Sequence, residues 1–278
     1  MVEGIDARRA VARWRILLFR IVTAAVAFFF LANIGNALAP WLPEGPPFLG
    51  ELRFPETHRW HGALPGTVRG LVVTGALVAL LWTPRANVLL VQWLAVSLIV
   101  GLPIIVPFAG LPALVFVGLP ALLVVVTYPW PRALLDVSTD RLSPVLLVLA
   151  AAATALLAPI MWREFGWQVA GVGGEHAATS HWASDVQHAA MLLLGAWLAG
   201  TLRPGWRPLA VLLGAAFLYL GVVAVAQPNQ AGSWGTSGGI LSIIGGVAFV
   251  AATIRESGGR PRPTAQREAA PVEERRAG

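Results

Sequence analysis

The residues with the clearest chemical potential lie in the stretch SHWASDVQHAA, which runs from Ser180 to Ala190. This stretch opens an apolar run, yet it carries His181, Asp185 and His188. Because serine is a good N-cap residue, we expect a helix to begin near Ser180. The three polar residues then fall at positions i, i+4 and i+7, on one face of that helix. Imidazole and carboxylate groups together suit zinc, iron, manganese or copper(II).

A second histidine pair precedes another apolar run. His58 and His61 are three residues apart and share a face if a helix begins near Glu56. Two helices that present such pairs at one depth, with Asp185, Glu56 and Glu175 nearby, supply four nitrogen or oxygen ligands to a divalent transition metal. The sequence therefore predicts a metal site. Its candidate ligands are His58, His61, His181, Asp185 and His188.

Two other interpretations of these residues stay open. His61 and His188 could ligate a haem b between two helices, although this is the less favoured cofactor. The plainest interpretation needs no ligand, because histidine and tryptophan are amphipathic and sit comfortably at a membrane surface. An aspartate near a helix N-terminus is also favoured by the helix dipole.

Arg69 is a separate candidate, since it lies inside an apolar run, where a charge is expensive. Such a charge usually faces a partner or a wet cavity. The sequence offers Asp185, at a similar depth in the apolar run at 183–202, as its ion-pair partner. The functional alternative is an anion-attracting group in an outward-facing cavity. The structural alternatives are a pair that fixes helix packing and simple snorkelling of the side chain to the outer surface.

The elements that must position these groups are membrane-spanning helices. The 278 residues are 56% hydrophobic and 12% charged, with a mean hydropathy of +0.69, whereas a soluble domain averages about 25% charged. Apolar windows of roughly 20 residues recur along the chain. An unbroken stretch at 88–127 is divided into a hairpin because glycines and prolines gather near its middle. We therefore expect an all-α, polytopic domain over 1–254 with about eight transmembrane helices. The expected spans are 16–38, 64–83, 88–106, 110–128, 144–161, 183–202, 208–226 and 238–254, followed by a disordered cytoplasmic tail at 255–278.

The arginines predict the orientation of these spans. All 20 basic residues are arginine, and with both termini in the cytoplasm 16 of them fall at cytoplasmic ends, loops or the tail. The positive-inside rule requires such a bias. All five histidines then lie at or near the external face. The arginine-only usage, with many alanines, glycines and prolines, indicates a GC-rich bacterial genome and hence a bacterial plasma membrane. The five histidines are His58, His61, His176, His181 and His188.

An internal repeat is suggested by two segments that share one layout. Each has a His/Trp entry, an apolar span, a short Pro/Arg turn and a second apolar span, and they begin at His58 and Ser180. An offset of four spans would relate them as parallel 4+4 repeats, about an axis along the membrane normal. Chance similarity between alternating apolar and basic segments is the open alternative.

Composition and motifs also remove several classes of function. The absence of cysteine excludes disulfides, thiolate metal sites and iron–sulfur clusters. No Walker-type loop and no G-x-G-x-x-G follows a strand, so we expect no nucleotide as partner. The positive charge flanks apolar spans and sets topology, so we expect no nucleic acid either. The expected partners are the lipid bilayer and either a membrane-protein subunit or a second copy of this chain.

Two limited resemblances to membrane hydrolases occur. The stretch GTSGG, from Gly235 to Gly239, resembles the G-x-S-G motif of rhomboid intramembrane proteases, in which the partner histidine lies downstream of the serine. No histidine follows Ser237 here. The set of Ser184, Asp185 and several histidines also resembles the inventory of the alkaline-ceramidase class of zinc-dependent membrane hydrolases. Spacing and helix order differ, so neither resemblance assigns a role to a residue.

Three functions therefore remain as hypotheses. The first is a membrane metalloprotein or metalloenzyme with an external His/Asp site, whose metal activates water or substrate. The second is a transporter or permease for a small solute, suggested by the repeat and by Arg69. The third is a non-catalytic assembly factor or scaffold.

Overall fold

The computed structural model describes residues 2–42, 58–139 and 141–258. It is all-α, with 83% helix and no strand in the described part of the chain. Six of the described helical segments are long and apolar enough to span a membrane. They are Arg13–Ala37, Arg59–Trp82, Arg85–Thr127, Pro144–Ala170, Trp206–Ala226 and Gly235–Gly258.

Six candidates do not confirm the predicted count of eight spans, and two features of the fold account for the difference. The 43-residue segment Arg85–Thr127 contains a break at Gly110, where φ is 58° and ψ is −140°. It comprises η4 (Arg85–Asn87), α5 (Val88–Ala113), η5 (Leu114–Gly118) and α6 (Leu119–Thr127). The other feature is the 19-residue helix α10 (His181–Ala199), which is not among the six candidates.

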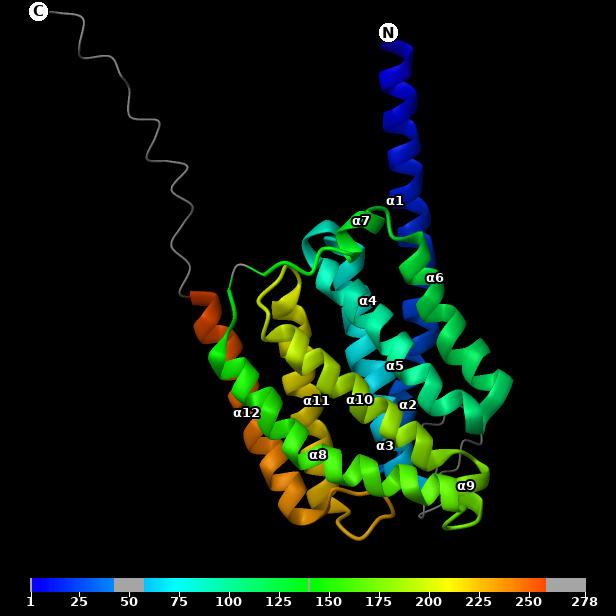
Figure 1. Cartoon of the computed structure of the whole chain (residues 1–278), viewed down its shortest axis with the longest axis vertical. Coiled ribbons are helices and arrows are strands. Elements are labelled where there is room, and N and C mark those ends of the chain that lie inside the picture. The colour runs from blue at the N-terminus through cyan, green and yellow to red at the C-terminus, as the bar shows by residue number, and fades with distance from the viewer. Residues whose placement is uncertain (1, 43–57, 140, 259–278) are drawn as a thin grey trace, which may run out of the picture.

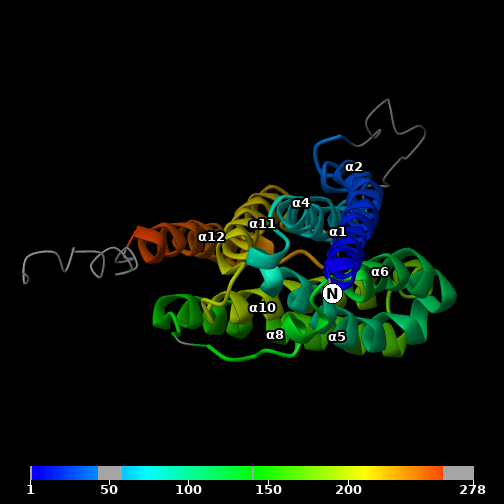
Figure 2. The same cartoon turned by 90° about the horizontal axis from the view of Figure 1, so that it is seen from above.

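The long helices form two layers, which are visible from above in Figure 2. One layer contains α12 (Gly235–Gly258), α11 (Trp206–Ala226), α4 (Thr74–Trp82) and α1 (Val2–Leu31). The other contains α8 (Pro144–Ala170), α10, α5 and α6. Contacts between the layers include those of α12 with α8, α11 with α10 and α1 with α6.

The two ends of the bundle differ in what they carry. The start of α1, the short helix α7 (Pro131–Leu134) and the last turn of α12 lie toward one end in Figure 1. The short helices α2 (Ile34–Ala37) and α9 (Glu175–Ala178), together with α3 (Arg59–Gly66), lie toward the opposite end. The helix α12 continues to Gly258, beyond the predicted end of the last span at 254. The rest of the predicted tail, 259–278, lies outside the described residues.

Close helix packing in the first layer depends on small residues. A Cβ on Gly239 of α12 would lie 2.7 Å from the carbonyl oxygen of Gly221 in α11, and a Cβ on Gly246 would lie 2.7 Å from that of Gly214. Only glycine permits this backbone contact, as is common between helices in membranes. Gly239 of the GTSGG stretch therefore packs α12 on α11, while Ser237 is exposed.

One irregular helix carries both His61 and Arg69. The helix α3 runs directly into the π-helix η3 (Thr67–Val73), which runs into α4. Pro65 lies inside α3 and has no backbone N–H to donate, so it cannot complete a regular ladder of hydrogen bonds. Wider π turns are frequent at functional sites. The Arg69 side chain therefore starts from an irregular turn within an apolar segment.

Candidate functional site

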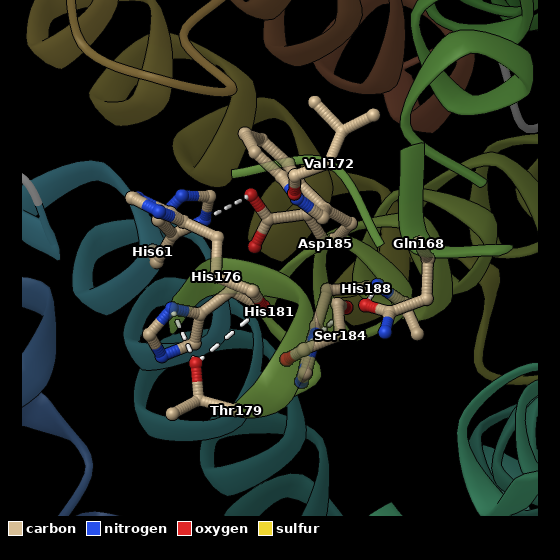
Figure 3. A network of polar contacts seen from close by, with 11 residues as sticks. His61, Gln168, Val172, His176, Thr179, His181, Ser184, Asp185 and His188 are labelled. Carbon is tan, nitrogen blue, oxygen red and sulfur yellow. Dashed lines mark hydrogen bonds and ion pairs between the residues drawn. The ribbon is translucent and has the colours of Figure 1, made fainter. Parts of the chain in front are cut away.

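Four histidine rings gather at the end of the bundle that carries α2, α3 and α9. His58 occupies the N-cap position of α3, and His61 lies in the first turn of that helix. His176 lies in α9. His181 is the first residue of α10, after Ser180 at the N-cap position, where the sequence predicted a helix start. Figure 3 shows His61, His176 and His181 side by side.

Three of these rings form a group that can hold a metal ion. One ring nitrogen from each of His58, His176 and His181 lies within 4.8 Å of the other two. Tetrahedral coordination at Zn–N distances of about 2.0–2.1 Å would place ligand nitrogens roughly 3.3 Å apart. Small ring rotations are therefore enough to bring the three nitrogens to bonding distance from one ion.

The ring of His181 is oriented by a hydroxyl group. Thr179 Oγ1 lies 2.6 Å from the Glu175 carbonyl oxygen and 3.1 Å from His181 Nδ1. Because the hydroxyl donates to that carbonyl, its oxygen accepts from His181 Nδ1–H. The lone pair of His181 then lies on Nε2, which is the tautomer that a metal ligand needs. This support of an imidazole by a polar neighbour is typical of metal sites.

His58 presents a free nitrogen in a neutral ring. Its Nε2 is buried and has no hydrogen-bond partner. Burial, followed by repulsion from His176, lowers the pKa of His58 below its ordinary value of 6.5. The ring is therefore neutral near pH 7, as metal coordination requires.

His61 and Asp185 form a buried pair next to this group. His61 Nδ1 lies 2.8 Å from Asp185 Oδ2, and both side chains are 1% exposed. The His61 ring stacks on the His181 ring, with centroids 4.9 Å apart and an angle of 13° between the planes. Since the carboxylate accepts from Nδ1–H, the lone pair of His61 lies on Nε2, which is buried and has no partner. The pair thus places an unpartnered ring nitrogen beside the three-histidine group.

The walls of the site are built by segments far apart in sequence. Gln168 of α8 donates to the Ala177 carbonyl and accepts from the Ala183 N–H, so it ties α9 and α10 to α8. Trp182 donates to the carbonyl of Val172. The loop between α11 and α12 covers the pair, because a Cβ on Gly232 would lie 3.1 Å from Asp185 Oδ2.

The sequence-based ligand set agrees with this geometry in part. His58 and His181 belong to the three-histidine group, and His61 and Asp185 lie beside it. His188 lies deeper along α10, where both ring nitrogens have partners: Arg69 Nε donates to Nε2 at 2.9 Å, and Nδ1 donates to the Ser184 carbonyl at 2.6 Å. This arrangement leaves His188 no free nitrogen for a metal or a haem iron.

Arg69 was expected to pair with Asp185, but the two residues have different partners. Asp185 accepts from His61, whereas Arg69 donates to His188. Within the described residues, no ion pair joins Arg69 to Asp185. The physical reason is that Asp185 and His188 lie at different depths along α10. As the i+4 and i+7 positions of that helix, they face different turns of the neighbouring helix.

Two residues of the site were missed from the sequence. His176 lies in a short helix between α8 and α10, without a periodic relation to the other histidines, so spacing gave no signal. Glu164 of α8 is 3% exposed, its Oε1 has no partner, and it interacts electrostatically with Asp185. A carboxylate inside an apolar run was the available signal for Glu164. Glu56, the predicted carboxylate near His58, lies outside the described residues.

No protein-family model matches the chain, and no curated protein or solved structure is significantly similar to it.

Proposed function

We propose that this protein is a membrane metalloprotein that binds a divalent transition metal through His58, His176 and His181. The observation that carries the proposal is the group of three ring nitrogens within 4.8 Å of one another. The free nitrogen of His58 and the tautomer of His181 support it. An all-nitrogen set of imidazoles suits zinc first, and also copper(II), iron or nickel.

Three protein ligands leave a fourth position for water or substrate, as in catalytic zinc sites. The His61 ring stacks on that of His181 with its Nε2 unpartnered, and Asp185 holds the ring in one tautomer by accepting from Nδ1–H. A metal of this kind lowers the pKa of bound water to about 7. We therefore infer water activation as the chemistry of the site, with His61 as proton acceptor.

Metal content of the purified protein tests the proposal. Wild type in a nonionic detergent should carry about one equivalent of metal after gel filtration, and a His176→Ala, His181→Ala double variant should carry none. His188→Gln is the matched control, since it alters a buried histidine outside the group and should retain the metal. A metal-free wild type, or a double variant that keeps its metal while folded, would reject the proposal.

We further propose that the chain crosses a bacterial plasma membrane eight times, with both termini in the cytoplasm. The two crossings beyond the six candidates come from the break at Gly110 and from α10. Arginine placement supports the orientation, as Arg132 belongs to α7, which lies at the end of the bundle where α1 begins (Figure 1). Arg85 lies 5.9 Å from the Trp130 ring, and Arg203 donates to the Asp136 carbonyl, so both lie beside α7.

The packing pattern favours a parallel 4+4 repeat. The first layer contains spans eight, seven, two and one, and the second contains spans five, six, three and four. A half-turn about an axis between the layers exchanges each span with the one four places along the chain. Contacts obey the same rule: α1 packs on α4 and α6, as α8 packs on α10 and α12. Ligand sites in repeat proteins lie at the interface of the two repeats, and α3 meets α10 there.

Transport of a small solute and a scaffolding role stay predictions. Both use the same helices, and neither requires the three-histidine group.

A further inference from the structure

A second polar cluster lies deeper in the bundle, around Arg69. The guanidinium donates from Nε to His188 Nε2 at 2.9 Å. Since arginine is always charged and offers no lone pair, His188 must accept at Nε2 and carry its proton on Nδ1. The Nδ1–H group donates to the Ser184 carbonyl. His188 is therefore neutral, and it does not compensate the charge of Arg69.

No carboxylate of the described residues lies within ion-pair distance of Arg69. Its Nε bond to His188 is the only hydrogen bond that its guanidinium makes with the described part of the protein. A charge inside an apolar span without a compensating partner is expensive and usually faces a partner or a wet cavity. The two terminal nitrogens of the guanidinium therefore have no acceptor among the described residues, and a negatively charged ligand would satisfy them.

A small cavity lies against this guanidinium. It has a volume of about 20 Å³, and its polar lining consists of Arg69, Ser97, Gln187 and His188. Ser97 and Gln187 are 4% and 2% exposed, and Ser97 Oγ and Gln187 Oε1 have no hydrogen-bond partner. The hydroxyl of Ser97 and the amide of Gln187 can both donate hydrogen bonds. The remaining lining is apolar.

We propose that this cavity is a binding site for a monovalent anion, either a halide or the carboxylate of an amphiphile. Arg69 supplies the charge, and Ser97 and Gln187 supply additional donors. The volume limits the charged part of the ligand, because a cavity needs about 10–15 Å³ to hold one water. A fatty acid places only its carboxylate in this volume, and its hydrocarbon chain lies outside the cavity. This site is independent of the three-histidine group, so either can fail alone.

Chloride-35 NMR line broadening on purified protein in dodecylmaltoside tests this site. Wild type should broaden the chloride signal in a saturable manner, and Arg69→Gln should weaken that effect at least tenfold. Arg20→Gln is the matched control, since Arg20 is an exposed arginine on a candidate membrane helix and should leave the broadening unchanged. Saturable broadening that persists in Arg69→Gln would overturn the proposal.

Competition identifies the source of the anion. If the carboxylate belongs to an amphiphile, laurate should displace chloride at concentrations at least tenfold below those of acetate, or fatty acid should be present at one equivalent in an organic extract of wild type. If the ligand is a halide, laurate and acetate should compete equally weakly. Should Arg69→Gln fail to fold, Ser97→Ala provides the same test with a smaller loss of affinity. Wild type with neither saturable chloride broadening nor bound fatty acid would refute the site.

Discussion

The Nδ1 atom of His61 lies 2.8 Å from Oδ2 of Asp185, although 124 residues separate them. This contact joins the start of α3 to the second turn of α10 at a point where both side chains are buried. A histidine–aspartate pair fixes both the orientation and the tautomer of its imidazole. The position of His61 Nε2 beside the three-histidine group therefore depends on a residue of a distant helix.

Asp185→Ala should destabilise the protein more than Asp185→Asn. Alanine leaves the Nδ1–H group of His61 buried without an acceptor, and an unsatisfied buried donor costs about 1–3 kcal/mol. Asparagine retains an acceptor oxygen, so the loss should be smaller. Unfolding of both variants in mixed micelles measures the difference. Equal losses would show that the hydrogen bond to His61 contributes little.

Gly232→Ala should disturb the site, whereas Gly235→Ala should not. Both glycines have positive φ, at 80° and 70°, so both substitutions carry backbone strain. Only at Gly232 would the new methyl group meet neighbours, with Trp60 Cδ1 at 3.0 Å and His61 Cε1 at 3.1 Å. We expect at least tenfold weaker metal binding for Gly232→Ala relative to Gly235→Ala, measured by zinc titration. Similar affinities would mean that the loop does not shape the site.

Gly110→Ala should destabilise the hairpin between α5 and α6. At φ 58° and ψ −140° the backbone occupies a region that is essentially restricted to glycine, and strain there costs about 1–3 kcal/mol. No atom lies within 4 Å of the added Cβ, so the effect is purely conformational. Gly166→Ala in α8 is the control: it also meets no atom, and the gain in helix propensity should stabilise by up to about 1 kcal/mol. If both substitutions stabilise, the turn is not at Gly110.

Cysteine labelling tests the orientation, because the natural chain has no cysteine. Ala178→Cys and Ser138→Cys introduce exposed thiols at opposite ends of the bundle. A membrane-impermeant maleimide added to right-side-out spheroplasts should label Ala178→Cys, and Ser138→Cys only after lysis. The reverse pattern would place the histidines in the cytoplasm.

The helical class was predictable from the sequence, because a bilayer imposes a long apolar run on every spanning helix. Helix ends were less so, since α8 continues to Ala170, beyond the predicted end of its span at 161. The turn near Gly110 was also predicted from its glycines and prolines. The span at 183–202 was predicted from its apolar run and corresponds to α10, although the polar first turns of this helix keep it out of the six candidate membrane spans.

The candidate site was predictable only where helical spacing governs it. His181, Asp185 and His188 share one side of α10, yet the sequence could not give their depth relative to Arg69. That depth depends on the π-helix η3 and on the close approach of α2, where a Cβ on Gly66 would clash with the backbone of Ala37. His176 joins the group because Gln168 holds α9 through a hydrogen bond to the Ala177 carbonyl. This tertiary contact has no local sequence pattern that could have predicted it.

X-ray absorption at the metal edge tests the central claim most directly. The zinc-loaded protein should show three imidazole nitrogens and one oxygen at about 2.0–2.1 Å, with no sulfur. The nitrogen count should fall to two in His176→Ala and stay at three in His188→Gln. A spectrum with no imidazole scattering, or one that changes with His188 and not with His176, would contradict a metal centre at His58, His176 and His181.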